Sequence, residues 1–126
     1  MKKIIETKNA PSPVGPYNQA IIANGILYCS GQIAIDPSSG VLITDDITKE
    51  TTQVMKNIEA ILKAAGSSFE QVIKCSIFMA DMNDYAAINS VYAEYFDEAT
   101  APAREAVEVA NLPKFVNVEI SCMALV

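Results

Sequence analysis

The sequence predicts an α+β domain with one mixed β-sheet and two helices on one face of that sheet. Two stretches repeat their apolar residues with the period of a helix, and six shorter stretches have strand character, in the order β–β–β–α–β–α–β–β. A length of 126 residues suits one domain. We therefore expect residues 1–126 to form a single unit.

The first strands follow a loop rich in proline. This loop, residues 10–17, contains three prolines and one glycine, which favour an ordered turn over a helix or strand. Strands are expected at Gln19–Ala23 and Ile26–Ser30, because Asn24-Gly25 between them is a strong hairpin signal. Ile33–Ile35 is expected to continue the strand.

Two helices are expected, one from about residue 47 to 65 and one from about residue 84 to 96. Asp46 can cap the first helix and Gly66 can end it, while either residue of Asn83-Asp84 can cap the second. Each helix has one apolar face, formed by Ile47, Val54, Met55, Ile58, Ile61, Leu62 and Ala65 in the first and by Ile88, Val91, Tyr92, Tyr95 and Phe96 in the second.

The remaining strands are expected at Val72–Ala80, Ala103–Val109 and Val116–Val126. The last of these is apolar at nearly every position, which is typical of a strand buried on both faces. The two helices can cover only one face of the sheet. We therefore expect another subunit to cover the other face.

Composition excludes several kinds of site. The chain has no histidine, so neither a Cys–His nor a Ser–His pair can form within it, and a zinc site of the usual Cys/His kind is nearly excluded. No metal site is predicted. The three cysteines are widely spaced among apolar or small residues, which indicates reduced thiols in the core.

Charge and hydropathy restrict the partners. A net charge of −6 gives no basic surface for nucleic acid, so no nucleic-acid partner is expected. No apolar run approaches the roughly 20 residues that a membrane span needs. No secretion signal follows the first residues, so we expect a cytoplasmic protein without a membrane partner.

Ten short stretches, spread over nearly the whole chain, carry a resemblance to a known family. They are Ala10-Pro11, Gly15–Gln19, Ser30–Gln32, Thr52–Val54, Asn57-Ile58, Ala60–Leu62, Pro102–Arg104, Val107–Ala110, Leu112–Lys114 and Val118–Ile120. The Pro-Ala-Arg block, followed at this distance by Val-Glu-Ile, is the most specific signal. On these motifs the chain resembles the RidA (YjgF/YER057c/UK114) family.

The resemblance implies a fold, an assembly and a reaction. The fold is a chorismate-mutase-like α+β domain, and the assembly is a homotrimer whose three sheets form a central barrel with ligand clefts between subunits. The reaction is the hydrolysis of reactive enamines and imines, such as those from 2-aminoacrylate and 2-aminocrotonate, to 2-oxo acids and ammonia. The partners are therefore small imino and oxo acids, and no cofactor is needed.

Three residues are the candidates for catalysis. Arg104 presents a planar fork of donors that matches a carboxylate, although a structural salt bridge is the alternative. Glu119 stands in an apolar run, where a carboxylate is costly unless it is paired or used. It can activate water and return a proton, or else pair with Arg104 or lie at a strand edge. The resemblance makes Tyr17 a cleft or lid residue, and ordinary surface packing is its alternative.

Four further residues are candidates for substrate binding. The resemblance implies that Ser30, Gly31 and the backbone of Ala106 help Arg104 hold the ligand carboxylate. A glycine lets a ligand approach the backbone, although Gly31 can equally mark a plain bulge. Asn89 can hydrogen-bond into the cleft or lie on a solvated helix face.

One position departs from the family pattern. Glu105 stands where the family usually has a small residue. Strand alternation places Glu105 on the face opposite to Arg104, and we expect it at a solvated strand end. This departure leaves a rival function open, a module that binds 2-oxo acids without turnover or has a regulatory role. A ribonuclease or translation inhibitor, a label that some relatives carry, ranks lower, because the acidic balance and the lack of histidine remove the usual phosphate-binding and acid–base groups.

Overall fold

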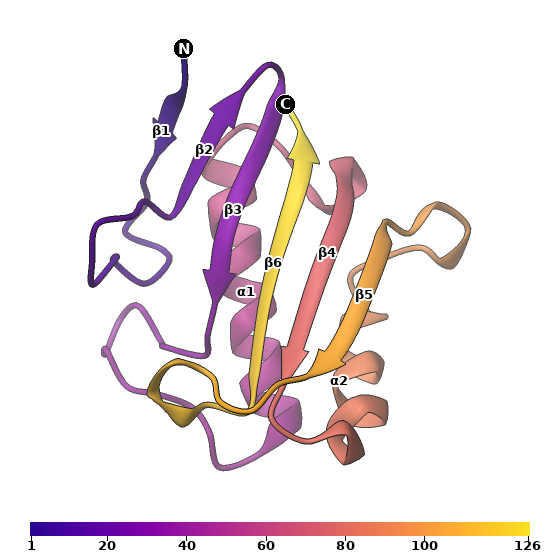
Figure 1. Cartoon of the computed structure of the whole chain (residues 1–126). Coiled ribbons are helices and arrows are strands. Elements are labelled where there is room, and N and C mark those ends of the chain that lie inside the picture. The colour runs from indigo at the N-terminus through magenta and orange to yellow at the C-terminus, as the bar shows by residue number, and fades with distance from the viewer.

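The computed structural model describes all 126 residues and contains one six-stranded sheet with two helices packed on one face (Figure 1). The strands are β1 (Lys3–Ile5), β2 (Ala20–Ala23), β3 (Ile26–Gln32), β4 (Val72–Met79), β5 (Ala103–Glu108) and β6 (Val118–Leu125), and the helices are α1 (Ile47–Ala64) and α2 (Tyr85–Tyr92). The spatial order is β1-β2-β3-β6-β4-β5. Only β4 and β5 pair in parallel, so the predicted mixed α+β sheet is confirmed.

The β2–β3 hairpin forms where the sequence predicts it. Asn24 and Gly25 have φ angles of 51° and 76°, the left-handed pair that a two-residue hairpin turn requires. β3 ends at Gln32, and Ile35 instead forms an isolated bridge to Leu42, so the expected continuation of the strand is wrong. β1 was not predicted, because three residues give no readable alternation; it pairs with β2 and buries only Ile5.

α1 matches the prediction at both ends. The Asp46 side chain accepts a hydrogen bond of 3.0 Å from the Lys49 N–H and so caps the first turn. Gly66 has a φ of 77°, and the N–H of Ser67 donates to the Leu62 carbonyl, which closes the helix in a Schellman motif. The apolar face of α1 packs on the sheet.

α2 is shorter than predicted at its carboxyl end. After Tyr92 the helix tightens, and each hydrogen bond spans three residues instead of four: the Glu94 N–H donates to the Val91 carbonyl, and the Tyr95 N–H donates to the Tyr92 carbonyl. Before α2, a single 3₁₀ turn is capped by Asp81 rather than by Asn83 or Asp84. The apolar stripe still packs inward, because Tyr95 lies 5.0 Å from the Phe69 ring, measured between centroids.

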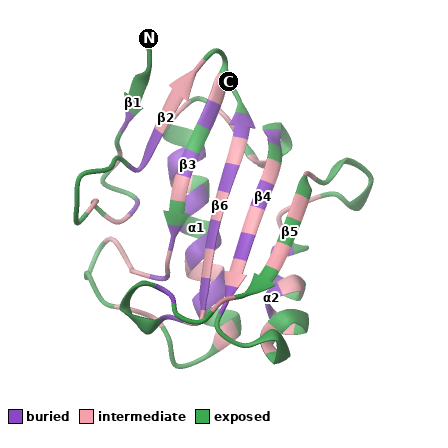
Figure 2. Cartoon of the chain, in the orientation of Figure 1, coloured by how far each residue is buried: buried purple, intermediate pink, exposed green.

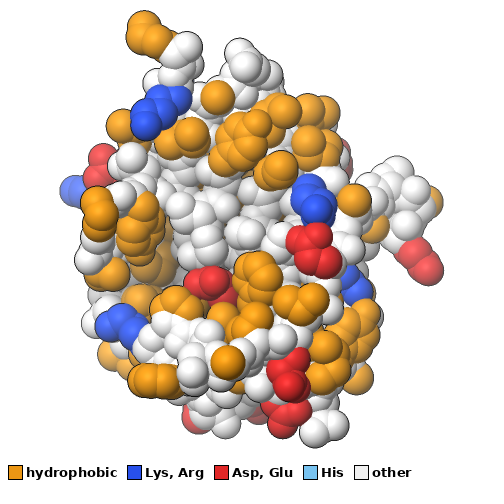
Figure 3. All heavy atoms as spheres, viewed as in Figure 1, with side chains coloured by type: hydrophobic (Ala, Val, Ile, Leu, Met, Phe, Trp, Pro, Cys, Tyr) orange, Lys and Arg blue, Asp and Glu red, His pale blue; other side chains and the backbone are white.

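β6 lies in the middle of the sheet and is buried on one face only. Its residues alternate between buried positions under the helices and half-buried positions on the opposite face; Glu119, Ser121 and Met123 form the second set (Figure 2). Burial of both faces is therefore wrong within a single chain. The uncovered face carries hydrophobic side chains interrupted by polar ones (Figure 3). Its cover by another subunit stays a prediction.

Neither helix combines the length and the apolar character that crossing a membrane would require.

Candidate functional site

Tyr17, Gly31 and Glu119 share one cavity. It has a volume of about 170 Å³, and its walls come from the proline-rich loop, from the segment around Gly31 and from the loop before β6. Ser30 lies beside it, because Ser30 and Tyr17 line the adjoining pocket. The structure thus brings together four of the predicted site residues.

Glu119 occupies space that only a glycine at position 31 leaves free. A Cβ atom on Gly31 would lie 2.7 Å from Glu119 Cδ and 3.0 Å from Glu119 Oε1. The pairing of β3 with β6 also shifts between Cys29 and Gln32, so the bulge interpretation of Gly31 is correct as well. The two interpretations are compatible, since the irregular backbone and the missing side chain both make room for the carboxyl group.

Burial raises the pKa of Glu119 above its usual value of 4.5. No ion pair or hydrogen bond within the chain opposes this shift, since burial is its only cause. The chain's single ion pair is elsewhere, between Lys74 and Glu105. A half-buried carboxyl group without a partner is well suited to exchange a proton with a bound molecule.

Two buried amides hold the walls of this cavity, and the sequence interpretation did not identify them as site residues. Gln19 Nε2 donates to the carbonyls of Thr7, Ala10 and Pro11 at 2.9–3.1 Å, and Gln19 Oε1 accepts from Thr7 N–H at 2.8 Å. These bonds fasten the proline-rich loop that carries Tyr17.

On the other wall, Asn57 of α1 donates to the carbonyls of Ile33 and Ile35 at 3.1 and 3.0 Å. This side chain ties the segment after Gly31 to the helix layer. The local sequence gives little signal for either amide, because Gln19 follows Asn18 and Asn57 follows Lys56, and their partners are backbone carbonyls that only the folded chain brings close.

The loop before β6 is strained and anchored. Lys114 and Phe115 have φ angles of 55° and 54°, which residues with a side chain rarely adopt. Asn117 donates through its N–H and its Nδ2 to the carboxylate of buried Glu50, both at 2.8 Å. Glu50 therefore fixes the chain two residues before Glu119.

Arg104 and Asn89 form a second group, between β5 and α2. Arg104 Nη1 donates to Asn89 Oδ1 at 2.7 Å, and Nη2 donates to the Tyr85 hydroxyl at 2.7 Å. The guanidinium carbon also lies 4.9 Å from the Tyr92 ring centroid. Asn89 is therefore turned toward Arg104 and is not a solvated helix residue. Tyr85 and Tyr92 were not predicted as site residues.

Ala106 follows Arg104 on the same side of β5. The N–H of Val109 donates to Met79 O across the β4–β5 pair. Because the hydrogen-bonding direction alternates along a strand, the N–H of Ala106 points to the unpaired edge of β5. This N–H is free to donate to a ligand there.

The two groups lie on opposite faces of the sheet. Arg104 pairs in register with Cys75, which is buried on the helix side, whereas Glu119 pairs with Phe78 on the open side. A salt bridge between Arg104 and Glu119, which the sequence left open, is therefore absent from the chain. Within one chain, the structure does not bring all the predicted site residues together.

Glu105 faces away from Arg104, as strand alternation predicted. It forms an ion pair of 2.9 Å with Lys74 and accepts a hydrogen bond from Ser76 on the neighbouring strand. The Ser76 hydrogen bond, helped by Lys74, holds the pKa of Glu105 below its usual value. Glu105 is exposed, but it lies within β5 rather than at its end, so that part of the prediction is wrong.

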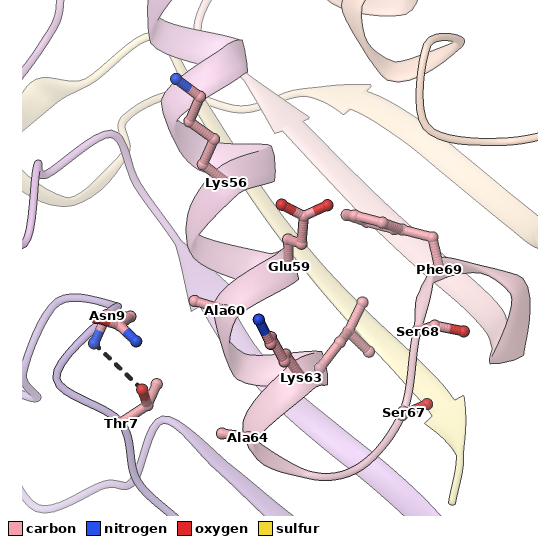
Figure 4. A pocket seen from close by; sticks show the side chains of 11 residues that line it. Thr7, Asn9, Lys56, Glu59, Ala60, Lys63, Ala64, Ser67, Ser68 and Phe69 are labelled. Carbon is pink, nitrogen blue, oxygen red and sulfur yellow. Dashed lines mark hydrogen bonds between the residues drawn. The ribbon is translucent and has the colours of Figure 1, made fainter.

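A hollow of about 710 Å³ beside the carboxyl-terminal half of α1 contains none of the predicted site residues. Figure 4 shows Lys56, Glu59 and Lys63 on α1, with Glu59 directed toward Phe69, and the hydrogen bond drawn joins Asn9 to Thr7. These charges form the solvated face of α1. No three His, Cys, Asp or Glu side chains converge on a point that could hold a metal ion.

The cysteines are buried and free, as predicted. Cys29, Cys122 and Cys75 lie side by side across β3, β6 and β4. Burial raises the pKa of the Cys75 thiol to about 12, which keeps it protonated and unreactive at neutral pH.

Comparison with known proteins identifies the family. The family model described as endoribonuclease L-PSP matches residues 7–126. A RutC family protein of Synechocystis is 54% identical over 124 residues, covering 98% of this chain and 95% of the relative. A goat protein named 2-iminobutanoate/2-iminopropanoate deaminase is 44% identical over 125 residues, covering 99% of this chain and 90% of the relative.

A solved structure agrees with this assignment. The crystal structure of YyfA from Yersinia pestis, described as a protein of unknown function of the conserved Rid family, superposes with a TM-score of 0.97 at 51% identity and full coverage of both chains. The chain therefore belongs to the endoribonuclease L-PSP family, which includes the Rid proteins.

Proposed function

We propose that this protein hydrolyses short 2-imino acids, formed from 2-aminoacrylate and 2-aminocrotonate, to 2-oxo acids and ammonia. The observation that carries the proposal is the pair of complementary groups: a guanidinium held in place by α2 and an unpartnered carboxyl group beside Gly31. A 2-imino acid needs both, since it has one carboxylate to bind and one carbon that water attacks. The name of the goat relative supports this reaction.

The proposal requires more than one copy of the chain. Arg104 and Glu119 lie on opposite faces of the sheet, so a single chain cannot place both on one small substrate. A homotrimer with clefts between subunits solves this problem, because Arg104 of one copy can then face Glu119 of the next. The open face of β6 and the unpaired edge of β5 are the surfaces available for it.

The chemistry follows from these groups. Arg104 binds the carboxylate, with the Ala106 N–H and the Ser30–Gly31 segment beside it. Glu119 accepts a proton from water as the water oxygen bonds to the imine carbon, and passes this proton to the imine nitrogen, which gives a carbinolamine. Glu119 then takes the hydroxyl proton of the carbinolamine and delivers it to the amine nitrogen as the carbon–nitrogen bond breaks. Ammonia leaves, and the product is a 2-oxo acid. Tyr17 covers this cavity.

A raised pKa suits Glu119 to both proton transfers. A carboxyl group whose pKa moves toward neutrality is a stronger base when ionised and is more easily protonated during the cycle. Positioning provides much of the remaining catalysis, because the imine is already reactive toward water.

The second candidate is a module that binds 2-oxo acids without turnover. The same carboxylate anchor favours it, since a 2-oxo acid retains the group that Arg104 would bind. Adding the protein to a pyridoxal-phosphate serine dehydratase reaction, in which 2-aminoacrylate forms, separates the two. The proposal predicts faster loss of the imine and earlier ammonia release, whereas unchanged imine decay with measurable binding of 2-oxobutanoate would support the binding module.

A further inference from the structure

Tyr85 is the first residue of α2, and its hydroxyl touches the proposed carboxylate anchor. The Tyr85 oxygen accepts a hydrogen bond of 2.7 Å from Arg104 Nη2, and the guanidinium carbon lies 5.7 Å from the centroid of the Tyr85 ring. Tyr85 as a whole is 37% exposed and is not part of the core.

α2 holds the guanidinium in one orientation. Tyr85, Asn89 and Tyr92 are spaced four and three residues apart, which places them on one side of the helix. Tyr92 packs against the guanidinium, while Asn89 and Tyr85 each accept one of its hydrogen bonds. An arginine has five N–H donors, so three remain for a ligand.

The direction of the Arg104–Tyr85 hydrogen bond leaves the Tyr85 proton unused. A tyrosine hydroxyl can accept and donate at the same time. Here it accepts from Arg104, and no residue of the chain accepts from it. The free O–H therefore lies within one hydrogen-bond length of the guanidinium edge at which a carboxylate would dock.

We propose that Tyr85 is a second carboxylate donor, which binds the same carboxylate group as Arg104 and selects carboxylates over neutral carboxamides. A carboxylate can accept about four hydrogen bonds, so it can receive the arginine fork and the tyrosine hydroxyl together. This inference extends the proposed function, because it concerns the substrate anchor of that same site, but it makes its own claim about binding.

The test is Tyr85→Phe, which removes the hydroxyl and keeps the ring. Affinity for 2-oxobutanoate, measured by calorimetry, should fall about tenfold or more, since hydrogen bonds to charged groups are the stronger class. Affinity for 2-oxobutanamide should fall clearly less, because a hydrogen bond to a neutral carbonyl is weaker than one to a carboxylate. In imine hydrolysis KM should rise while kcat stays within about twofold. Tyr95→Phe is the matched control, because Tyr95 packs on Phe69 and has no contact with Arg104.

A double-mutant cycle separates direct binding from a role that acts only through Arg104. In an Arg104→Lys background, Tyr85→Phe should still weaken 2-oxobutanoate binding. If it has no effect there, Tyr85 only positions Arg104 and the inference is wrong. Equal affinity of wild type and Tyr85→Phe, or no binding by either, would also overturn it.

The outcomes keep this inference apart from the proposed function. If the wild-type protein does not hydrolyse the imine but its 2-oxobutanoate binding still depends on the Tyr85 hydroxyl, the proposed deaminase function is wrong and the role of Tyr85 as a carboxylate donor stands. If the wild-type protein hydrolyses the imine but Tyr85→Phe changes neither KM nor affinity, the deaminase function stands and the role of Tyr85 as a carboxylate donor is wrong.

Discussion

Arg104 and Glu119 differ in how the fold treats their charge. The Arg104 guanidinium has two hydrogen-bond acceptors and an aromatic face as neighbours, so its orientation is fixed before any ligand binds. Glu119 has no such partner, and burial alone acts on its pKa. One group is therefore prepared to bind an anion, and the other is prepared to exchange a proton.

Arg104→Ala should abolish accelerated imine hydrolysis and leave the protein folded. The side chain is only partly buried and has no ion pair, so its loss leaves no unpaired buried charge. Activity should fall at least 100-fold, because both affinity and orientation depend on this group. Circular dichroism and thermal melting provide the folding control. A folded variant that keeps full activity would remove Arg104 from the site.

Glu119→Gln should reduce turnover at least 100-fold while 2-oxobutanoate binding survives, because the amide keeps the shape but cannot accept the proton.

Burial raises the pKa of Glu119, so the folded state favours the protonated carboxyl group, and stability falls as pH rises through that raised pKa. At neutral pH the glutamine variant should therefore melt at a higher temperature than wild type. Wild-type turnover should rise over the same pH range. A variant that melts lower and turns over normally would contradict both assignments.

Gly31→Ala should disturb Glu119 directly. The new methyl group would meet the carboxyl carbon at 2.7 Å, so Glu119 must move and activity should fall at least tenfold. In a Glu119→Ala background the same substitution should cost much less stability, since the clashing side chain is gone. Equal stability costs in the two backgrounds, from urea unfolding, would show that Gly31 matters only as a bulge.

At the level of elements, the loop before β6 stores strain close to the site. A bulky residue in the left-handed region costs about 1–2 kcal/mol, and glycine avoids that cost. Phe115→Gly should therefore be about 0.5–1 kcal/mol more stable to unfolding than Phe115→Ala. The comparison isolates the backbone, because both variants lose the same exposed ring. An alanine variant at least as stable as the glycine variant would show that the loop is not strained.

Regular elements with strong patterns were predictable, and short or tertiary-dependent ones were not. α1 was predicted almost to the residue, because its periodicity, cap and stop agree. β1 has three residues and no pattern, and the end of α2 depends on aromatic packing that the sequence does not encode locally. Strand alternation correctly placed Glu105 and Arg104 on opposite faces of the sheet. The apolar content of β6 could not show that one of its faces is open, because a half-buried strand can also be apolar at most positions.

In the candidate site, too, the residues with a strong local signal were predictable, and those whose role depends on distant partners were not. Residue type and family motifs pointed to Arg104, Asn89, Gly31 and Glu119, and the structure gives each a defined neighbour. The supporting side chains were not recognised, because the partners of a group such as Gln19 are backbone carbonyls of distant segments. Their roles follow only from the folded chain.

At the scale of the whole molecule, the open face of the sheet is the feature that remains unexplained by one chain. Hydrophobic side chains gather on it, and the two groups of site residues lie on opposite sides of the sheet (Figure 3). Sedimentation equilibrium should give a mass near three times the 13.6 kDa of the chain. A stable monomer would leave the proposed function without a complete site.

The most direct test of a shared cleft is complementation between two inactive variants. Arg104→Ala supplies an intact Glu119, and Glu119→Gln supplies an intact Arg104, so mixed assemblies rebuild some clefts. Random exchange at equal amounts should restore about a quarter of wild-type imine hydrolysis, because each cleft draws its two residues from two different copies. Native mass spectrometry would verify that subunits exchanged. If mixed assemblies form and stay as inactive as either parent, Arg104 and Glu119 do not act in one cleft, and the central claim is wrong.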